Sequence, residues 1–253
     1  MTSILNRSLD YRCLALTGAF ETAAGFPGCF SHVAGDFDGQ GISFGALQWN
    51  LGQGTLQPLL AQMEKAQPAL FQQVLDGQYA GLKAGLELPG AGQLAWASSI
   101  QDASHRIAAP WLEKFQALGS TPAFQEVQRR AADGIYQSAL TLQAAYGLKS
   151  ERGLALMFDI RVQNGGISAD VKAQIESDFA RLASSQDPMD LEVERLRIVA
   201  NRRAEAANPR WIEDIRARKL TIANGQGTVH GQSYDLAADF GIRLEEMAST
   251  TSP

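Results

Sequence analysis

Three carboxyl-bearing residues lie near the start of the chain at positions that suggest acid–base chemistry. Glu21 follows a segment from Leu9 to Phe20 whose apolar spacing predicts a helix, while Asp36 and Asp38 open a glycine-rich stretch that runs from residue 35 to 55. Two carboxyl groups that face each other from different elements are the minimum equipment for hydrolysing a glycosidic bond. The spacing therefore favours a glycosidase with its acids on either side of a cleft.

The glycine-rich stretch predicts a small β-hairpin. Ile42, Phe44 and Ala46 fall on one face of an extended segment, and Ser43 lies on the other. Glycines on both sides supply the turns that fold such a segment into a ribbon. The ribbon would carry Asp36 and Asp38 toward the helix end that bears Glu21.

The two acids need different surroundings. A general acid must stay protonated near neutral pH, which a poorly solvated site favours, and Glu21 has Phe20 beside it and Phe26 nearby in sequence. A general base must stay ionised, and the backbone N–H groups of the glycines beside Asp38 suit that role. A carboxyl separation of about 6.5 to 9.5 Å would invert the sugar anomer, and one of about 5 Å would retain it. Asp36 is a rival base, although such an acid more often caps a turn.

Three residues just after the ribbon are candidate sugar contacts. The indole of Trp49 is suited to stacking on a sugar face, and the amides of Gln48 and Asn50 to binding hydroxyl or acetamido groups. The alternative for Trp49 is an ordinary place in the core or at its rim.

The rest of the chain is helical in pattern, so the expected fold class is mainly α with one small β-ribbon. Proline, serine and threonine start signals and glycine stop signals delimit the predicted helices. These are Pro68 to Leu75, Gln78 to Leu86, Gly92 to Ile107, Pro110 to Leu118, Pro122 to Tyr146, Glu151 to Val162, Ala169 to Leu182, Leu191 to Ala206 and Pro209 to Lys219. We expect residues 1–247 to form a single two-lobed domain and residues 248–253 a flexible tail.

Composition limits the partners. The 253 residues, 45% of them hydrophobic, can bury a substantial core. The formal net charge of −5, without a basic stripe, argues against a nucleic acid or polyanionic partner. No segment near the start suits a Sec signal peptide, and none approaches ~20 consecutive apolar residues. We therefore expect cytoplasmic synthesis and no membrane partner.

The cysteines and histidines give weak signals. The spacing of Cys13 and Cys29 permits a disulfide, although buried free thiols are the commoner outcome without a signal peptide. Cys29 and His32, with His105 and His230 elsewhere, raise the possibility of a zinc site or a Cys-His peptidase. Neither has supporting ligand spacing.

The run from residue 36 to 41 also looks like the opening of an EF-hand calcium loop. The twelfth position of such a loop would be Leu47, where a bidentate Glu is needed. We therefore expect no calcium site, and the glycosidase interpretation calls for no metal and no organic cofactor.

The motif Phe20-Glu21-Thr22, followed by the run from Asp38 to Gly45, resembles the chitosanases of glycoside hydrolase family 46 and their relatives in the lysozyme superfamily. The resemblance implies a lysozyme-like, two-lobed fold with a central cleft and an inverting mechanism. Glu21 would be the general acid and Asp38 the general base. Ser43 would replace the family's threonine that helps hold the attacking water; the alternative is an ordinary strand serine.

Two further segments are similar to the family more weakly. Residues 156–165 resemble a buried helix with a Tyr-Asp-x-x-Val-x-His-Gly pattern, and residues 228–234 resemble a Val-Tyr-Gly-x-x-Tyr segment. The resemblance suggests that Asp159 joins a buried ion-pair network that supports the base, with arginine partners drawn from Arg195, Arg197, Arg202 and Arg203. A solvated charged helix face is the alternative.

One departure from the family bears on the substrate. Chitosanases carry an Asp after Gly-x-Gly that grips the free amine of glucosamine, and Thr55 stands there in this chain. A neutral residue suits an N-acetylated sugar, so we expect a peptidoglycan hydrolase, a muramidase that cuts the β-1,4 bond between N-acetylmuramic acid and N-acetylglucosamine. The alternatives are a chitosanase and a non-catalytic glycan-binding module.

The same fold serves phage lysins and secreted antibacterial effectors. We therefore expect this chain to act in the periplasm or cell wall of a target or host bacterium. An immunity protein and a secretion or phage-tail carrier are therefore possible partners beside the cell-wall glycan.

Overall fold

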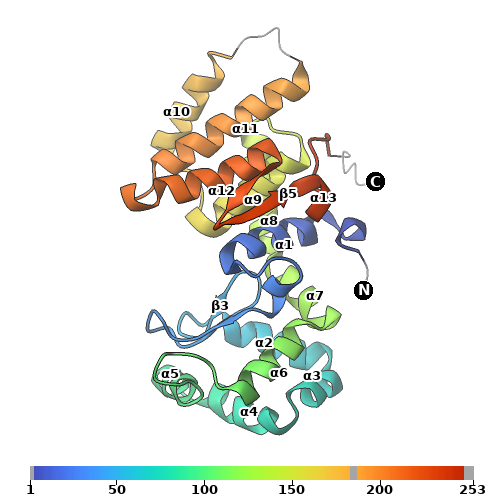
Figure 1. Cartoon of the computed structure of the whole chain (residues 1–253), viewed down its shortest axis with the longest axis vertical. Helices are drawn as coiled ribbons and strands as arrows, with labels where there is room; N and C mark the ends of the chain where they lie inside the picture. Colours follow the sequence, from blue (N-terminus) through green and yellow to red (C-terminus); the bar gives the residue numbers. More distant parts are fainter. Residues whose placement is uncertain (1–2, 183–186, 248–253) are drawn as a thin grey trace. The chain divides into compact units, whose positions relative to one another are not determined.

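The computed structural model describes residues 3–182 and 187–247, and its internal contacts divide them into two compact units (Figure 1). We call residues 21–132 the ribbon unit. Residues up to Phe20, together with those from Asp133 onward, form the helical unit. The tail predicted at residues 248–253 lies outside the described residues.

A small antiparallel sheet lies at the start of the ribbon unit. Its strands occur in the order β1 (Val33–Ala34), β2 (Ser43–Phe44) and β3 (Trp49–Asn50). The predicted hairpin is β2–β3, and the three residues predicted to share one face, Ile42, Phe44 and Ala46, are all buried. Strand β1 was not predicted, since two residues are too few to show an alternating pattern.

Helices make up the remainder of the ribbon unit. They are α2 (Leu56–Ala66), α3 (Pro68–Leu75), α4 (Tyr79–Glu87), α5 (Gly90–Ser99), α6 (Ala109–Gly119) and α7 (Pro122–Ala131), with 3₁₀ turns η2 (Gly28–Ser31) and η3 (Asp76–Gln78). Phe44 packs the sheet against the helices of the same unit. The centroid of its ring lies 5.5 Å from that of Phe115 on α6 and 5.1 Å from that of Phe124 on α7. The ribbon is thus anchored by one aromatic side chain of its central strand.

One predicted helix of this unit is too long. The segment expected to continue to Ile107 ends at Ser99, because the carboxylate of Asp102 accepts hydrogen bonds from the backbone N–H groups of Ser104 (2.8 Å) and Arg106 (3.0 Å). A side chain that bonds its own backbone offers an alternative to the helix. The result is a turn closed by a β-bridge between Gln101 and Ile107.

The helical unit consists of long helices and one hairpin. Its elements are η1 (Ile4–Asn6), α1 (Leu9–Thr22), α8 (Asp133–Ala145), α9 (Glu151–Asn164), α10 (Ala169–Phe179), α11 (Pro188–Glu205), η4 (Pro209–Trp211), α12 (Ile212–Asn224), β4 (Gln226–Val229), β5 (Gln232–Asp235) and α13 (Leu236–Phe240). The last two residues of α1 belong to the ribbon unit. The fold class predicted from sequence, mainly α with a small ribbon, is confirmed.

The helix predicted from Pro122 to Tyr146 is divided in two. Helix α7 ends at Ala131, and α8 begins at Asp133, whose charge is favourable in a first helical turn. Within the described residues, no helix is both long enough and apolar enough to cross a bilayer.

Candidate active site

The ribbon unit contains every residue that the sequence predicts to act on a substrate. These residues are Glu21, Asp36, Asp38, Ser43, Gln48, Trp49, Asn50 and Thr55. All of them fall within one compact unit, with Glu21 at its first residue, on a helix whose earlier residues belong to the helical unit.

The loop between β1 and β2 holds the two aspartates in different ways. The half-buried Asp36 accepts a hydrogen bond at Oδ1 from the backbone N–H of Gly41 (3.0 Å), and its own N–H donates to Gln101 Oε1 (2.7 Å). The exposed Asp38 accepts at Oδ1 from the N–H of Gln40 (3.1 Å). The N–H groups expected from glycines beside Asp38 thus come from Gln40 instead. Asp38 remains open to solvent and to an incoming water.

Glu21 is the second-to-last residue of α1, and its side chain is exposed rather than enclosed. The expected apolar cover is absent because the neighbouring rings have other partners. Phe20 is fully buried, edge-on to Tyr234 at 4.9 Å, and Phe26 packs edge-on to Phe30 at 6.3 Å.

Ser43, Asn50 and Thr55 form a local hydrogen-bond network in the ribbon. Ser43 Oγ accepts from Asn50 Nδ2 (2.9 Å), and Thr55 Oγ1 accepts from the N–H of Asn50 (2.7 Å) while donating to its carbonyl (3.1 Å). Asn50 is only 5% exposed, so we assign its amide a positioning role. Thr55 makes no side-chain cap on α2 because its hydroxyl is engaged with Asn50. Ser43 keeps its own hydroxyl proton for donation.

The turn between β2 and β3 places Gln48 and Trp49. Gln48 has a left-handed backbone (φ 52°), and its Nε2 donates to the carbonyl of Gly45 (2.8 Å). Trp49 is partly buried against the core of the ribbon unit and lies opposite Phe44 in the sheet. Of the three predicted sugar contacts, Gln48 and Trp49 are thus held by the ribbon with part of each side chain accessible, whereas Asn50 is buried.

Gln128 on α7 anchors the ribbon, and sequence reasoning missed it. Its side chain is fully buried, donates to the carbonyl of Phe30 (2.9 Å) and accepts from the N–H of Ala46 (2.9 Å). Gly45 permits this approach, since a Cβ there would lie 2.5 Å from Gln128 Oε1. One amide thus ties the segment that follows Glu21 to the ribbon turn.

A second missed feature is an exposed aromatic ring between the two aspartates. Phe37 is 71% exposed and lies 6.1 Å from the ring of His105. Both rings border a pocket of about 300 Å³ that Val33 and Ile107 also line. Apolar and aromatic side chains are the usual lining of a ligand pocket. The position of Phe37 between two acidic residues is the sequence feature that could have predicted an exposed ring here.

The helical unit holds a buried ion cluster around Asp159, but its partners differ from those expected. Arg218 donates to Asp159 Oδ1 from Nε (2.9 Å) and Nη2 (2.6 Å), and Lys219 Nζ donates to Oδ2 and to Gln163 Oε1 (2.7 Å). Burial would raise the pKa of Asp159, but the charges of Arg218 and Lys219 outweigh it and lower that pKa to about 2.

The four arginines of α11 were the wrong partners because their helix directs them elsewhere. Arg202 pairs with Asp178 (2.6 Å) and Arg197 with Glu194 (2.6 Å), while Arg195 lies over the ring of Phe179. Helix α12 supplies the cations to Asp159 instead, since it packs on α9.

The cysteines are buried free thiols, and the pKa of Cys29 is raised by burial to about 12. Across residues 3–182 and 187–247, no three His, Cys, Asp or Glu side chains gather as a metal site would require.

Comparison with known proteins identifies the fold. No protein-family model matches the sequence, and no curated protein is similar to it. Among solved structures, the native chitosanase from Bacillus subtilis MY002 is similar with a TM-score of 0.53 and 18% identity, covering 91% of this chain and 97% of that one. A mutant of that chitosanase complexed with 6 GlcN gives a TM-score of 0.52 and 16% identity, over 91% and 97% of the two chains.

A glycoside hydrolase family 46 chitosanase from Gynuella sunshinyii, complexed with chitotetraose, gives a TM-score of 0.51 and 16% identity over 89% of this chain and 96% of that one. At such identities the similarity establishes the fold, which is the lysozyme-like fold of chitosanases.

Proposed function

We propose that this protein is a glycoside hydrolase that cuts β-1,4-linked polymers of amino sugars. The observation that carries the proposal is the chitosanase fold over 91% of the chain, combined with Glu21 at the end of α1 and Asp38 in the loop before β2. Those are the positions at which the motif resemblance expects the two acids.

Glu21, Asp38 and Ser43 have separate roles in the proposed hydrolysis. Glu21 protonates the glycosidic oxygen as the bond to the leaving sugar breaks, and Asp38 takes a proton from the water that attacks the anomeric carbon. The hydroxyl of Ser43, held by Asn50, is suited to orient that water. Attack from the face opposite the leaving group inverts the anomer.

Polymeric glucosamine is the best-supported substrate, because the solved relatives are chitosanases and two of them hold GlcN or chitotetraose. Thr55 favours a second candidate, peptidoglycan, since no carboxylate stands at that position to bind a free amine. In that case the enzyme would be a muramidase used as an antibacterial effector or phage lysin.

The test is incubation of wild type and Glu21→Gln with chitosan and with purified peptidoglycan, followed by mass spectrometry of soluble products. Glu113→Gln is the matched control, because Glu113 is an exposed glutamate of the same unit on α6. We expect glucosamine oligomers from wild type and the control but not from Glu21→Gln.

Muropeptides ending in an intact reducing muramic acid would select peptidoglycan instead. Products from neither substrate would refute the hydrolase and favour a glycan-binding module. Equal products from wild type and Glu21→Gln would show that another residue is the acid.

A further inference from the structure

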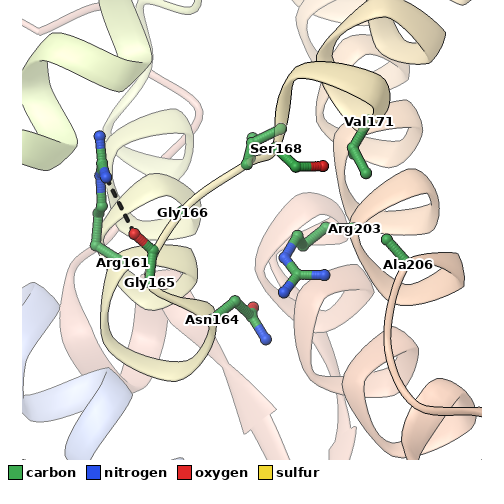
Figure 2. Close-up of a pocket in the computed structure, with 9 residues that line it drawn as sticks. Arg161, Asn164, Gly165, Gly166, Ser168, Val171, Arg203 and Ala206 are labelled. Atoms are coloured by element: carbon green, nitrogen blue, oxygen red, sulfur yellow. Dashed lines mark hydrogen bonds between the residues drawn. The ribbon is translucent and has the colours of Figure 1, made fainter.

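A pocket of about 390 Å³ lies within the helical unit, between the end of α9, the start of α10 and the last turn of α11 (Figure 2). Its polar lining includes Arg161, Asn164, Ser168 and Arg203, and Val171 is on its apolar side. No aspartate or glutamate lines it. The pocket therefore gathers cationic and neutral polar groups without a carboxylate to balance them.

Arg203 is the unusual member of this set. Its neighbour Arg202 pairs with Asp178 (2.6 Å) and Glu205 (2.9 Å). Arg203 has neither a hydrogen bond nor an ion pair in the part of the chain that the structure describes, and its Nε is buried. Burial lowers the pKa of its guanidinium. A guanidinium whose Nε is shielded from water without a counter-ion is destabilising, and a bound anion would offset part of that cost.

The opposite wall offers complementary groups. Figure 2 shows the guanidinium of Arg203 turned toward Asn164, whose Oδ1 is also buried without a partner among the described residues. Arg161 Nη1 donates to the carbonyl of Gly165 (3.1 Å) and lies where a Cβ on Gly166 would come within 2.9 Å. The glycine loop thus leaves room for the side chain of Arg161, which also lines the pocket.

We infer that this pocket binds a phosphate-type oxyanion, either free phosphate or a phosphate monoester. Planar guanidinium forks match phosphate oxygens. Hydrogen phosphate also carries a P–OH donor, which would satisfy the buried Oδ1 of Asn164. Because the whole chain carries a net charge of −5, attraction of an anion has to come from the local site. The inference is independent of the proposed hydrolase function.

The test is isothermal titration calorimetry of the full chain with inorganic phosphate, glucose 6-phosphate and acetate. All titrations use the same ionic strength, since salt screens exposed charges. We expect phosphate to bind and acetate to bind far more weakly. Arg203→Gln should weaken phosphate binding at least about tenfold. Arg210→Gln is the control, since Arg210 is an exposed arginine that lies over Trp211 and does not line the pocket; it should leave binding unchanged.

Binding of both phosphates would indicate that the free anion suffices, and binding of glucose 6-phosphate alone would indicate a monoester. Acetate binding as tight as phosphate binding, or equal affinity in wild type and Arg203→Gln, would overturn the inference. Amide chemical shifts of wild type give a readout that needs no variant. Phosphate should move the signals of Gly165, Gly166 and Ser168, and shifts confined to other regions would also overturn it.

Discussion

Replacing Asp159 with asparagine tests the buried ion cluster of the helical unit. The carboxylate is fully buried, as is Lys219, and Arg218 is 2% exposed. Asp159→Asn keeps the side-chain volume but leaves two buried cations that share a neutral amide. Breaking a buried pair by removing one partner costs about 3–5 kcal/mol. That is a large part of a typical unfolding free energy of about 5–15 kcal/mol.

The pH dependence of stability gives a second value for the free energy that ionised Asp159 contributes to folding. Because the folded pKa of Asp159 is lowered to about 2 from its ordinary 3.8, its stabilisation is complete above the unfolded pKa and lost as pH falls through 2. A shift of that size corresponds to about 2 kcal/mol. The stability gap between wild type and Asp159→Asn should therefore narrow by about 2 kcal/mol between pH 6 and pH 2.

Urea unfolding can be monitored by hydrogen exchange of peptides from α9 and α12. This measurement would report on the stability of the helical unit alone. The matched control is Asp178→Asn, which breaks a partly exposed pair with Arg202 and should cost no more than about 1 kcal/mol. Equal costs for the two variants at pH 6, or a gap that widens in acid, would refute the argument.

Four further outcomes are expected. Asp38→Asn should abolish hydrolysis of chitosan or peptidoglycan while Asp36→Asn retains most of it, and the reverse result would make Asp36 the base. Phe37→Ala should raise KM several-fold with little change in kcat or Tm, because the ring is 71% exposed, and an unaltered KM would remove it from substrate binding. Gln128→Leu should cost about 1–3 kcal/mol in thermal unfolding, because a buried carbonyl and N–H lose their partner, and an unchanged Tm would contradict the anchoring role. Native protein should show no thiol reaction with an aromatic disulfide reagent at pH 8, since burial holds the pKa of Cys29 at about 12 and Cys13 is also buried; rapid labelling would refute the burial.

Sequence reasoning succeeded where the structure depends on neighbours along the chain. Helix α3 has the predicted bounds, Pro68–Leu75, and α9 begins at the predicted Glu151, where Ser150 caps the helix by accepting from the N–H of Gly153. The residues of the candidate site remain a prediction from a local motif, and the structure places all of them within one unit. Proline and capping side chains act within a single helical turn, so a sequence displays them directly.

Sequence reasoning failed where contacts between distant segments determine the structure. Gln128 and Ala46 are 82 residues apart in the sequence, and Arg218 and Asp159 are 59 apart. Neither pair therefore produces a periodic sequence pattern from which its contact could be predicted. The arginines of α11 looked equally suitable by charge, and only the packing of α12 on α9 distinguished them. The exposure of Glu21 was missed for the same reason, because the direction of Phe20 depends on Tyr234.

The division of the chain has a consequence for its biosynthesis. The ribbon unit is one continuous segment, whereas the helical unit needs α1 together with helices that follow residue 132. On a ribosome, the ribbon unit is complete while the apolar residues of α1, such as Leu14 and Leu16, still lack the rest of their core. We expect early folding of the inserted segment to hasten completion of the other unit, because a compact insert shortens the loop that must close.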